Sequence, residues 1–197
     1  MRVPQVVGAS VLVALVGCGA PAVSVPDTPP VSELWSDLDF GTAAAKIATR
    51  PGIAVNDDGQ YVEYVLSKDW LYRFEPYRDT LPPNPTDRLV AVQVAEPLGD
   101  TLALWPRWHA ARRSLSTELG QDPVCVVIGG PLFRVTRAEF AGSPAISVSA
   151  EIDFEEDGQA YEARLIVAAA EITDPSDLDR GFARERVDCE APPGGVL

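Results

Sequence analysis

Apolar residues at helical spacing mark one strong helix in the second half of the chain. The residues of this stripe follow one another at intervals of three, four and four: Trp108, Ala111, Leu115 and Leu119. Pro106 suits the first turn of such a helix, and Gly120 suits its end. Three arginines fall off the stripe, namely Arg107, Arg112 and Arg113.

Two shorter helices are predicted near the beginning of the chain. Ser32 can cap a helix that carries Leu34, Trp35 and Leu38 on its inner side. Thr42 can cap a second helix over residues 43–49, which Pro51-Gly52 would end.

Elsewhere the apolar positions alternate with polar ones or form short runs, as in β-strands. The predicted strands cover residues 53–55, 60–66, 70–74, 89–94, 124–128, 132–136, 145–154 and 159–169. Helices and strands therefore follow the same order twice. This order predicts an α+β fold in which short helices pack on antiparallel β-sheet in two similar halves, residues 32–100 and 101–189, with a tail at 190–197.

Two Asp-Gly pairs predict hairpin turns and fix the strand register beside them. Asp58-Gly59 would place Val55 opposite Val62 and Ile53 opposite Tyr64. Asp157-Gly158 would create four apolar cross-strand pairs: Phe154 with Tyr161, Ile152 with Ala163, Ala150 with Leu165, and Val148 with Val167. Both turns share Asp-Gly-Gln followed by Glu, either as an internal repeat or as convergence on good turn chemistry.

The N-terminus contains an apolar run over residues 6–16 that ends in Leu15-Val16-Gly17-Cys18. This run is too short to span a bilayer as a helix. The last four residues resemble the lipobox of bacterial lipoproteins. The resemblance implies that residues 1–17 are a signal peptide and that Cys18 is lipidated, with acyl chains such as palmitate. Ordinary signal-peptide cleavage near Ala20 or Ala22 is the alternative.

The lipoprotein resemblance also implies a location in the bacterial cell envelope. The lipid would anchor the protein on the outer side of the plasma membrane or in the outer membrane, and Gly19 after the cysteine favours the latter in two-membrane bacteria. Residues 18–31 are rich in proline and predict an extended tether between the lipid and the fold.

The order of elements also resembles small envelope lipoproteins of the SmpA/BamE type and the tandem modules of beta-lactamase inhibitory proteins. Phe40-Gly41-Thr42 before a short helix and hairpin, and Leu119-Gly120 with Pro123 after the second helix, carry this resemblance. It implies modules in which a helix pair precedes an antiparallel sheet, and an envelope protein as the partner.

A formal net charge of −13 disfavours nucleic acid as a partner, because phosphate backbones repel an acidic chain. The membrane would therefore be reached through the lipid. Two cysteines besides Cys18, Cys125 and Cys189, predict a disulfide that contributes about 4 kcal/mol by constraining the unfolded chain. Two unpaired thiols are the alternative.

Catalytic motifs are absent from the sequence. His109 is the only histidine and lies in the strong helix, where a surface or partly packed position is expected. No cysteine has the neighbours that redox catalysis or zinc binding requires. The sequence therefore predicts a protein that is not an enzyme and carries no cofactor.

The sharpest polar feature is acidic. The predicted hairpin register places Asp153 directly opposite Glu162, and Glu151 opposite Arg164. Calcium would relieve the repulsion between the first two carboxylates, so Asp153 and Glu162 are candidate metal ligands. The alternative is a solvated sheet face whose repulsion is screened by salt.

The alternating aromatic residues Trp70, Tyr72 and Phe74, with Tyr77 after them, allow two interpretations. They form part of the core, or Trp70, Tyr72 and Tyr77 form an exposed platform for a partner protein.

Three functions remain open from the sequence. The leading hypothesis is a non-catalytic, membrane-anchored module for protein interaction or envelope assembly. The alternatives are a solute- or calcium-binding lipoprotein and an enzyme of unknown class. A pocket with convergent polar groups would favour the solute-binding protein. Two buried carboxylates beside a cleft would favour the enzyme. An exposed aromatic patch without a pocket would favour the interaction module.

Overall fold

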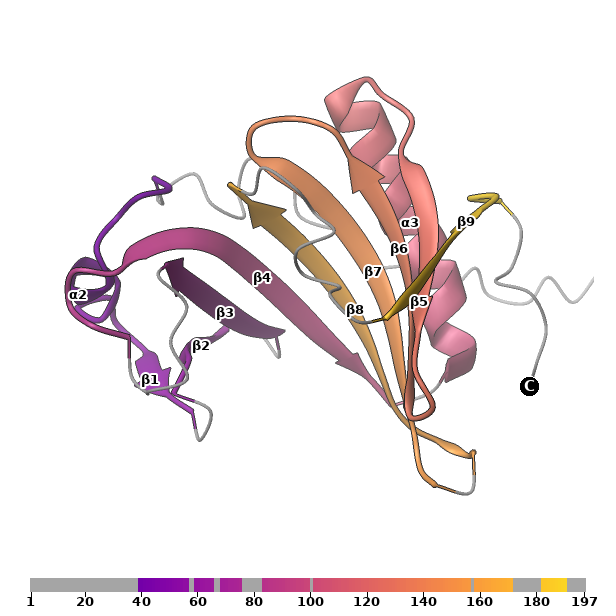
Figure 1. Cartoon of the computed structure of the whole chain (residues 1–197), viewed down its shortest axis with the longest axis horizontal. Helices are drawn as coiled ribbons and strands as arrows, with labels where there is room; N and C mark the ends of the chain where they lie inside the picture. The colour runs from indigo at the N-terminus through magenta and orange to yellow at the C-terminus, as the bar shows by residue number, and fades with distance from the viewer. Residues whose placement is uncertain are drawn as a thin grey trace, which may run out of the picture.

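A single curved antiparallel sheet dominates the molecule (Figure 1). The computed structural model describes residues 39–56, 59–65, 68–75, 83–99, 101–156, 158–171 and 182–190. Within these residues the sheet has nine strands in the order β1-β2-β3-β4-β8-β7-β6-β5-β9. From one edge of the sheet, β1 to β4 lie in chain order, and β8 to β5 then lie in reverse chain order. The two sets join where β4 pairs with β8.

The strands and helices have the following bounds. The strands are β1 Ile53–Val55, β2 Tyr61–Val65, β3 Lys68–Glu75, β4 Arg88–Leu98, β5 Val124–Gly129, β6 Phe133–Phe140, β7 Ala145–Phe154, β8 Ala160–Ala170 and β9 Ala183–Val187. The helices are α2 Ala44–Ile47 and α3 Thr101–Leu119. Among the described residues, no helix is both long enough and apolar enough to cross a bilayer.

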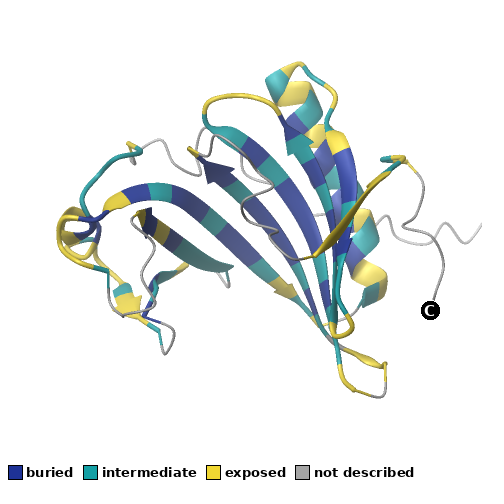
Figure 2. Cartoon of the chain, viewed as in Figure 1, coloured by how far each residue is buried: buried dark blue, intermediate teal, exposed yellow. Residues whose placement is uncertain are grey.

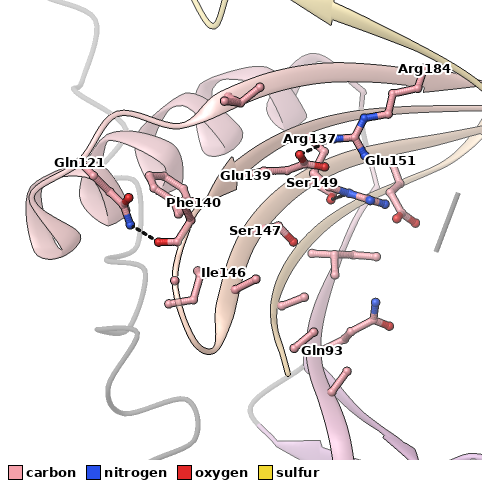
Figure 3. A pocket seen from close by; sticks show the side chains of 18 of the residues that line it. Gln93, Gln121, Arg137, Glu139, Phe140, Ile146, Ser147, Ser149, Glu151 and Arg184 are labelled. Atoms are coloured by element: carbon pink, nitrogen blue, oxygen red, sulfur yellow. Dashed lines mark hydrogen bonds and ion pairs between the residues drawn. The ribbon is translucent and has the colours of Figure 1, made fainter. Parts of the chain in front are cut away.

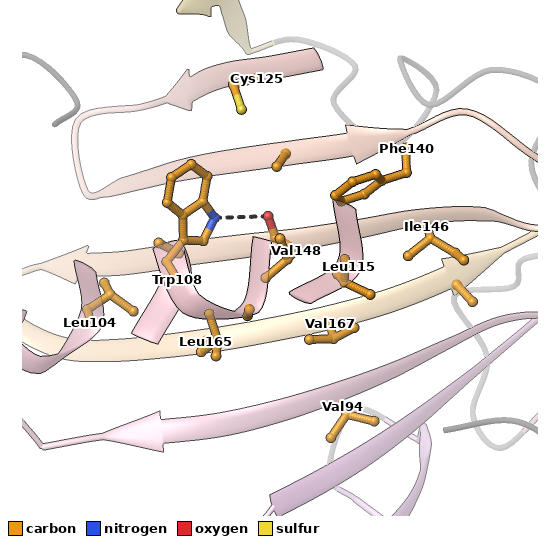
Figure 4. Packing of buried hydrophobic residues seen from close by; sticks show 14 of the residues in the cluster. Val94, Leu104, Trp108, Leu115, Cys125, Phe140, Ile146, Val148, Leu165 and Val167 are labelled. Atoms are coloured by element: carbon orange, nitrogen blue, oxygen red, sulfur yellow. Dashed lines mark hydrogen bonds between the residues drawn. The ribbon is translucent and has the colours of Figure 1, made fainter. Parts of the chain in front are cut away.

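Helix α3 packs along β7 and β8 and covers one face of the sheet, which we call the helix face. Trp108 is its central residue, 1% exposed, and its indole Nε1 donates a hydrogen bond of 3.0 Å to the Val148 carbonyl oxygen (Figure 4). The predicted stripe is confirmed: Ala111 and Leu115 are buried, and Leu119 packs against the same core. Gly120 ends the helix with a φ of 63°.

Two features of α3 differ from the prediction. The helix begins at Thr101, so Pro106 lies inside it rather than in the first turn. The earlier start buries Leu104 one turn before Trp108, and this apolar contact offsets the hydrogen bond that proline cannot make.

The arginines off the stripe also behave differently from one another. Arg107 and Arg112 are buried, and Arg113 is exposed. Arg107 Nη2 contacts both carboxylate oxygens of Glu96 at 2.9 and 2.6 Å, while Arg112 pairs with Glu190 and lies 5.7 Å over the Trp108 ring. Ionic partners make the burial of both charges tolerable.

A second apolar cluster lies at the β1–β4 end of the sheet (Figure 2). It consists of Ala44, Ile47, Tyr61, Tyr72, Phe74, Leu89 and Val92. Helix α2 contributes the first two but is shorter than predicted, and Thr42 does not cap it. The Thr42 hydroxyl donates instead to the Asp39 carbonyl oxygen at 2.5 Å, and the amides of Gly41 and Ala44 donate to Leu89 and Asp87. The predicted helix after Ser32 lies outside the described residues.

The β1–β2 hairpin is one residue out of the predicted register. Val55 pairs with Tyr61, and Ile53 pairs with Glu63. The amide of Asn56 donates to the Gln60 carbonyl oxygen at 3.0 Å, and the amide of Gly59 donates to the Asn56 carbonyl oxygen at 2.8 Å. With Gly59 at a φ of 69°, these bonds close the hairpin between Asn56 and Gln60 rather than around the predicted two-residue turn.

The β7–β8 hairpin confirms three of its four predicted pairs, and the fourth is wrong. Phe154 pairs with Ala160 instead of Tyr161, because the register shifts after Asp153. Glu155, Gly158 and Gln159 repeat the backbone bonds of the first turn at 2.8 and 2.9 Å. The two Asp-Gly-Gln turns thus belong to the first hairpin of the set β1–β4 and to the last hairpin of the set β5–β8. Because these positions are not equivalent, the match supports shared turn chemistry rather than an internal repeat.

The predicted fold class overstates the share of helix in the protein. The described helices have 4 and 19 residues, and strands form most of the fold, so the protein is β-rich rather than an even α+β arrangement. All eight predicted strands are present, and β9 is an additional one. The predicted boundary near residue 100 falls between β4 and α3.

Strand β9 pairs with β5 at the edge of the sheet and brings the C-terminal cysteine beside it. Cys125 and Cys189 form the predicted disulfide, with an S–S distance of 1.98 Å and a Cα–Cα distance of 5.3 Å. The described chain after β9 is thereby tied to β5, the strand next to this edge.

Candidate functional site

A pocket of about 500 Å³ lies on the sheet face opposite α3, which we call the pocket face (Figure 3). Alternation along the strands separates the two faces: Val148 and Ala150 of β7 belong to the core under α3, whereas Ser147 and Ser149 line the pocket. In β8, Leu165 and Val167 belong to the core, whereas Ile166 and Ala168 line the pocket. The volume is typical of a small-molecule site.

The pocket floor consists of rows of side chains that run across neighbouring strands. One row, which we call the alanine row, has alanine on three strands in the order Ala145, Ala170 and Ala91, and the exposed Arg73 of β3 follows Ala91. The next row contains Glu139, Ser147, Ala168 and Gln93, and the third contains Arg137, Ser149 and Ile166. The floor thus changes from apolar to polar along the strand direction.

Charged side chains surround the polar end. Arg184 of β9 donates through Nη2 to Glu139 Oε2 at 2.5 Å, so the edge strand forms one wall of the pocket. Arg137 donates through Nε to the Ser149 hydroxyl at 3.2 Å. Figure 3 shows both interactions at the end of the pocket away from Phe140 and Ile146. At that opposite end, the Gln121 amide donates to the Ala141 carbonyl oxygen at 2.9 Å.

Glu151 continues the polar end toward the β7–β8 hairpin. Burial raises the pKa of this carboxyl group above its usual value, and Arg164 and Arg137 oppose the shift without cancelling it. The ionised carboxylate is therefore less well solvated here than in water. One carboxylate oxygen of Glu139, Oε1, is also buried without a hydrogen-bond partner among the described residues.

The candidate metal ligands lie together, as their predicted pairing requires. Asp153 pairs with Glu162 across β7 and β8. Arg164 lies among the carboxylates: its Nη2 is 2.6 Å from Asp153 Oδ2 and 3.9 Å from Glu151 Oε2, and its Nε is 3.8 Å from Glu162 Oε1. An arginine thus supplies the positive charge for which the sequence suggested calcium. In the described part of the chain, no three His, Cys, Asp or Glu residues are grouped to hold a metal ion.

The aromatic residues of β3 belong to the core. Tyr72 is 1% exposed, and its hydroxyl donates to Glu63 Oε2 at 2.6 Å, so the structure contradicts its assignment to an exposed platform. Phe74 is also buried, and Trp70 is partly buried against both apolar clusters. Tyr77 and Cys18 lie outside the described residues.

His109 is partly buried on α3, as expected, and does not line the pocket. Burial, with Arg112 as a second cause, lowers the pKa of its imidazole. Its Nδ1 finds no hydrogen-bond partner among the residues that the structure describes.

Comparisons with known proteins give no matching family model, no matching curated protein and no matching solved structure.

Sequence reasoning did not find this pocket, although part of its signal was present. Residues 147, 149 and 151 of the predicted strand are polar at every second position, and two of them are serines rather than charged residues. The other walls come from β3, β4, β6 and β9. Nothing in the hydrophobic pattern indicates that β4 pairs with β8, so these residues could not be brought together from the sequence.

Proposed function

We propose that this protein is a non-catalytic lipoprotein of the bacterial cell envelope that binds a small molecule on the pocket face of its sheet. The observation that carries the proposal is the pocket itself. It combines a floor that is apolar at one end with converging amide, hydroxyl, guanidinium and carboxylate groups. A few polar groups in a mainly apolar concave site are typical of small-molecule binding.

Binding is favoured over catalysis by the state of the two carboxylates in the pocket. Glu139 is held by Arg184, and the side chains of Glu139 and Glu151 keep 15% and 23% of their surface exposed. Acid–base catalysis by two carboxyl groups needs both of them poised on either side of a substrate. An ion-paired carboxylate beside a second arginine is better suited to holding a ligand than to transferring a proton.

Binding a solute is also favoured over the interaction module that the sequence first suggested. The proposed aromatic platform loses Tyr72 to the core, whereas the pocket has the converging polar groups expected of a solute site. The lipobox at residues 15–18 supports an anchor at Cys18. Intact mass spectrometry of membrane-purified chain checks the anchor, and an unmodified Cys18 would contradict it.

The binding proposal is tested by native mass spectrometry of full-length chain purified from bacterial membranes. We expect a non-covalent small molecule bound to the wild-type chain. Ala168→Leu places a larger side chain in the middle of the pocket floor, between Ser147 and Gln93, and should remove the bound mass. The loss has a steric cause, because Leu fills the space above the sheet.

Ala54→Leu is the matched control, since Ala54 is exposed on β1 and does not line the pocket. This variant should keep the bound mass. A wild-type chain without any bound molecule, or a molecule equally retained by Ala168→Leu, would refute the proposed site.

A further inference from the structure

The gradient of the pocket floor specifies the shape of the ligand. On β7, β8 and β4 the alanine row offers only methyl groups, with Arg73 at its exposed β3 end, and successive rows along β7 add Ser147, Ser149 and then Glu151. Side chains on one face of a strand repeat every two residues, so successive rows lie about 7 Å apart. A ligand that follows the strands therefore meets an apolar surface first and a polar one about 7 to 14 Å further on.

On the floor and near wall of the polar end, two positive charges face two negative ones: Arg137 and Arg184 are matched by Glu139 and Glu151. The exposed Arg186 of β9 adds a positive charge in the row of Arg137, whereas Arg73 continues the alanine row and Asp122 lies beside Gln121 at the other end. A head group with a full charge would compete with one of these side chains for its partner and would lose its own hydration. A neutral head group avoids both costs.

The polar end also requires a head group that both donates and accepts hydrogen bonds. Glu139 Oε1 is a buried acceptor with no partner among the described residues, and a buried unpaired acceptor is costly. Gln93 and Ser147, in the same row, can donate as well as accept. Hydroxyl groups have this double capacity, whereas carboxylates only accept and ammonium groups only donate.

We infer that the pocket binds a neutral amphiphile whose polyhydroxylated head lies among Glu139, Ser147 and Gln93 and whose short alkyl tail lies over the alanine row. This inference rests on the proposed small-molecule site and adds the chemical class of its ligand. A cavity of about 500 Å³ has room for a sugar-sized head with a tail of several carbons.

The test compares three probes that share an octyl tail and differ in the head: octyl glucoside, octanoate and octylammonium. Isothermal titration calorimetry at concentrations below micelle formation measures their binding to the full-length chain carrying Cys18→Ala. We expect octyl glucoside to bind about tenfold more tightly than either charged probe, which is the contribution of one good hydrogen bond to a charged group.

Gln93→Leu keeps the size of the side chain and removes its polar atoms, so it should reduce glucoside affinity about tenfold. Gln60→Leu, in the β1–β2 hairpin and outside the pocket lining, should leave this affinity unchanged. Loss of glucoside binding in Ala168→Leu would confirm that the probe occupies the pocket.

The outcomes separate this inference from the function on which it rests. Tighter binding of octanoate or octylammonium, or no effect of Gln93→Leu, would overturn the neutral polyol head. Failure of all three probes would overturn the amphiphile class, while a co-purified molecule lost in Ala168→Leu would still support the solute site. Glucoside binding that survives Ala168→Leu would place the probe elsewhere and refute the inference.

Discussion

The helix face and the pocket face are built from the same strands, yet they have opposite characters. In β7 and β8 the residues beneath α3 are Val148, Ala150, Leu165 and Val167, all buried in one continuous core. Their neighbours on the pocket face include Ser147, Ser149, Ile166 and Ala168, and they line a cavity instead of packing against a helix. Under the proposed function, stability and binding therefore depend on alternate residues of the same strands, so substitutions one position apart should have different effects.

The largest expected effect is on the helix face. Trp108→Ala should lower the free energy of unfolding by about 3–5 kcal/mol, because it leaves a large cavity and removes the hydrogen bond to the Val148 carbonyl oxygen. Trp105→Ala is the matched control, since Trp105 is only partly buried in the same helix. Chemical denaturation measures both variants, and equal losses would contradict the central role of Trp108.

The disulfide is expected to have the next largest effect. Replacing Cys125 and Cys189 by alanine should lower the free energy of unfolding by about 2–4 kcal/mol. Reductant should lower the melting temperature of the wild-type chain by a similar mechanism but leave the double variant unchanged. Recovery of both thiols from denatured, unreduced chain would show that the bond is absent.

The smallest effect is expected on the pocket face and depends on pH. Because burial raises the pKa of Glu151 in the folded protein, its contribution to stability is complete below the usual value of 4.5 and is lost as pH rises. Glu151→Gln lacks this loss, so the variant should gain on the wild type between pH 4 and pH 8, within about 1 kcal/mol. Thermal melts across this range provide the measurement.

Glu155→Gln is the control for this pH series, since Glu155 is exposed in the β7–β8 turn. The stability difference between Glu155→Gln and wild type should change less with pH. A Glu151→Gln curve parallel to that of the wild type would contradict the cause assigned to the shift.

Local patterns in the sequence predicted the helix face well. The period of Trp108, Ala111 and Leu115 identified α3, and alternation gave the bounds of β7 as residues 145–154. Each of these predictions depends on residues close together in the chain. The register errors at Val55 and Phe154 arose because Asp-Gly fits both a two-residue turn and a longer loop with a glycine bulge.

Features that depend on distant contacts could not be predicted in this way. Arg107 and Arg112 are buried because Glu96 and Glu190 meet them from other elements. Strand β9 has charged residues at 184, 185 and 186, without an apolar pattern, and it forms by pairing with β5. The pocket depends on both the β4–β8 junction and β9, so its residues converge only once the whole sheet is assembled.

The covalent link between Cys125 and Cys189 bears on how one wall of the pocket is held. Strand β9 pairs with β5 and brings Arg184 to Glu139. The disulfide from Cys125 of β5 to Cys189 fixes the residues that directly follow β9. Disulfides form in oxidising compartments and are reduced in the cytosol. Reduction of the bond would thus leave this wall of the pocket held to the sheet by the pairing of β9 with β5 alone.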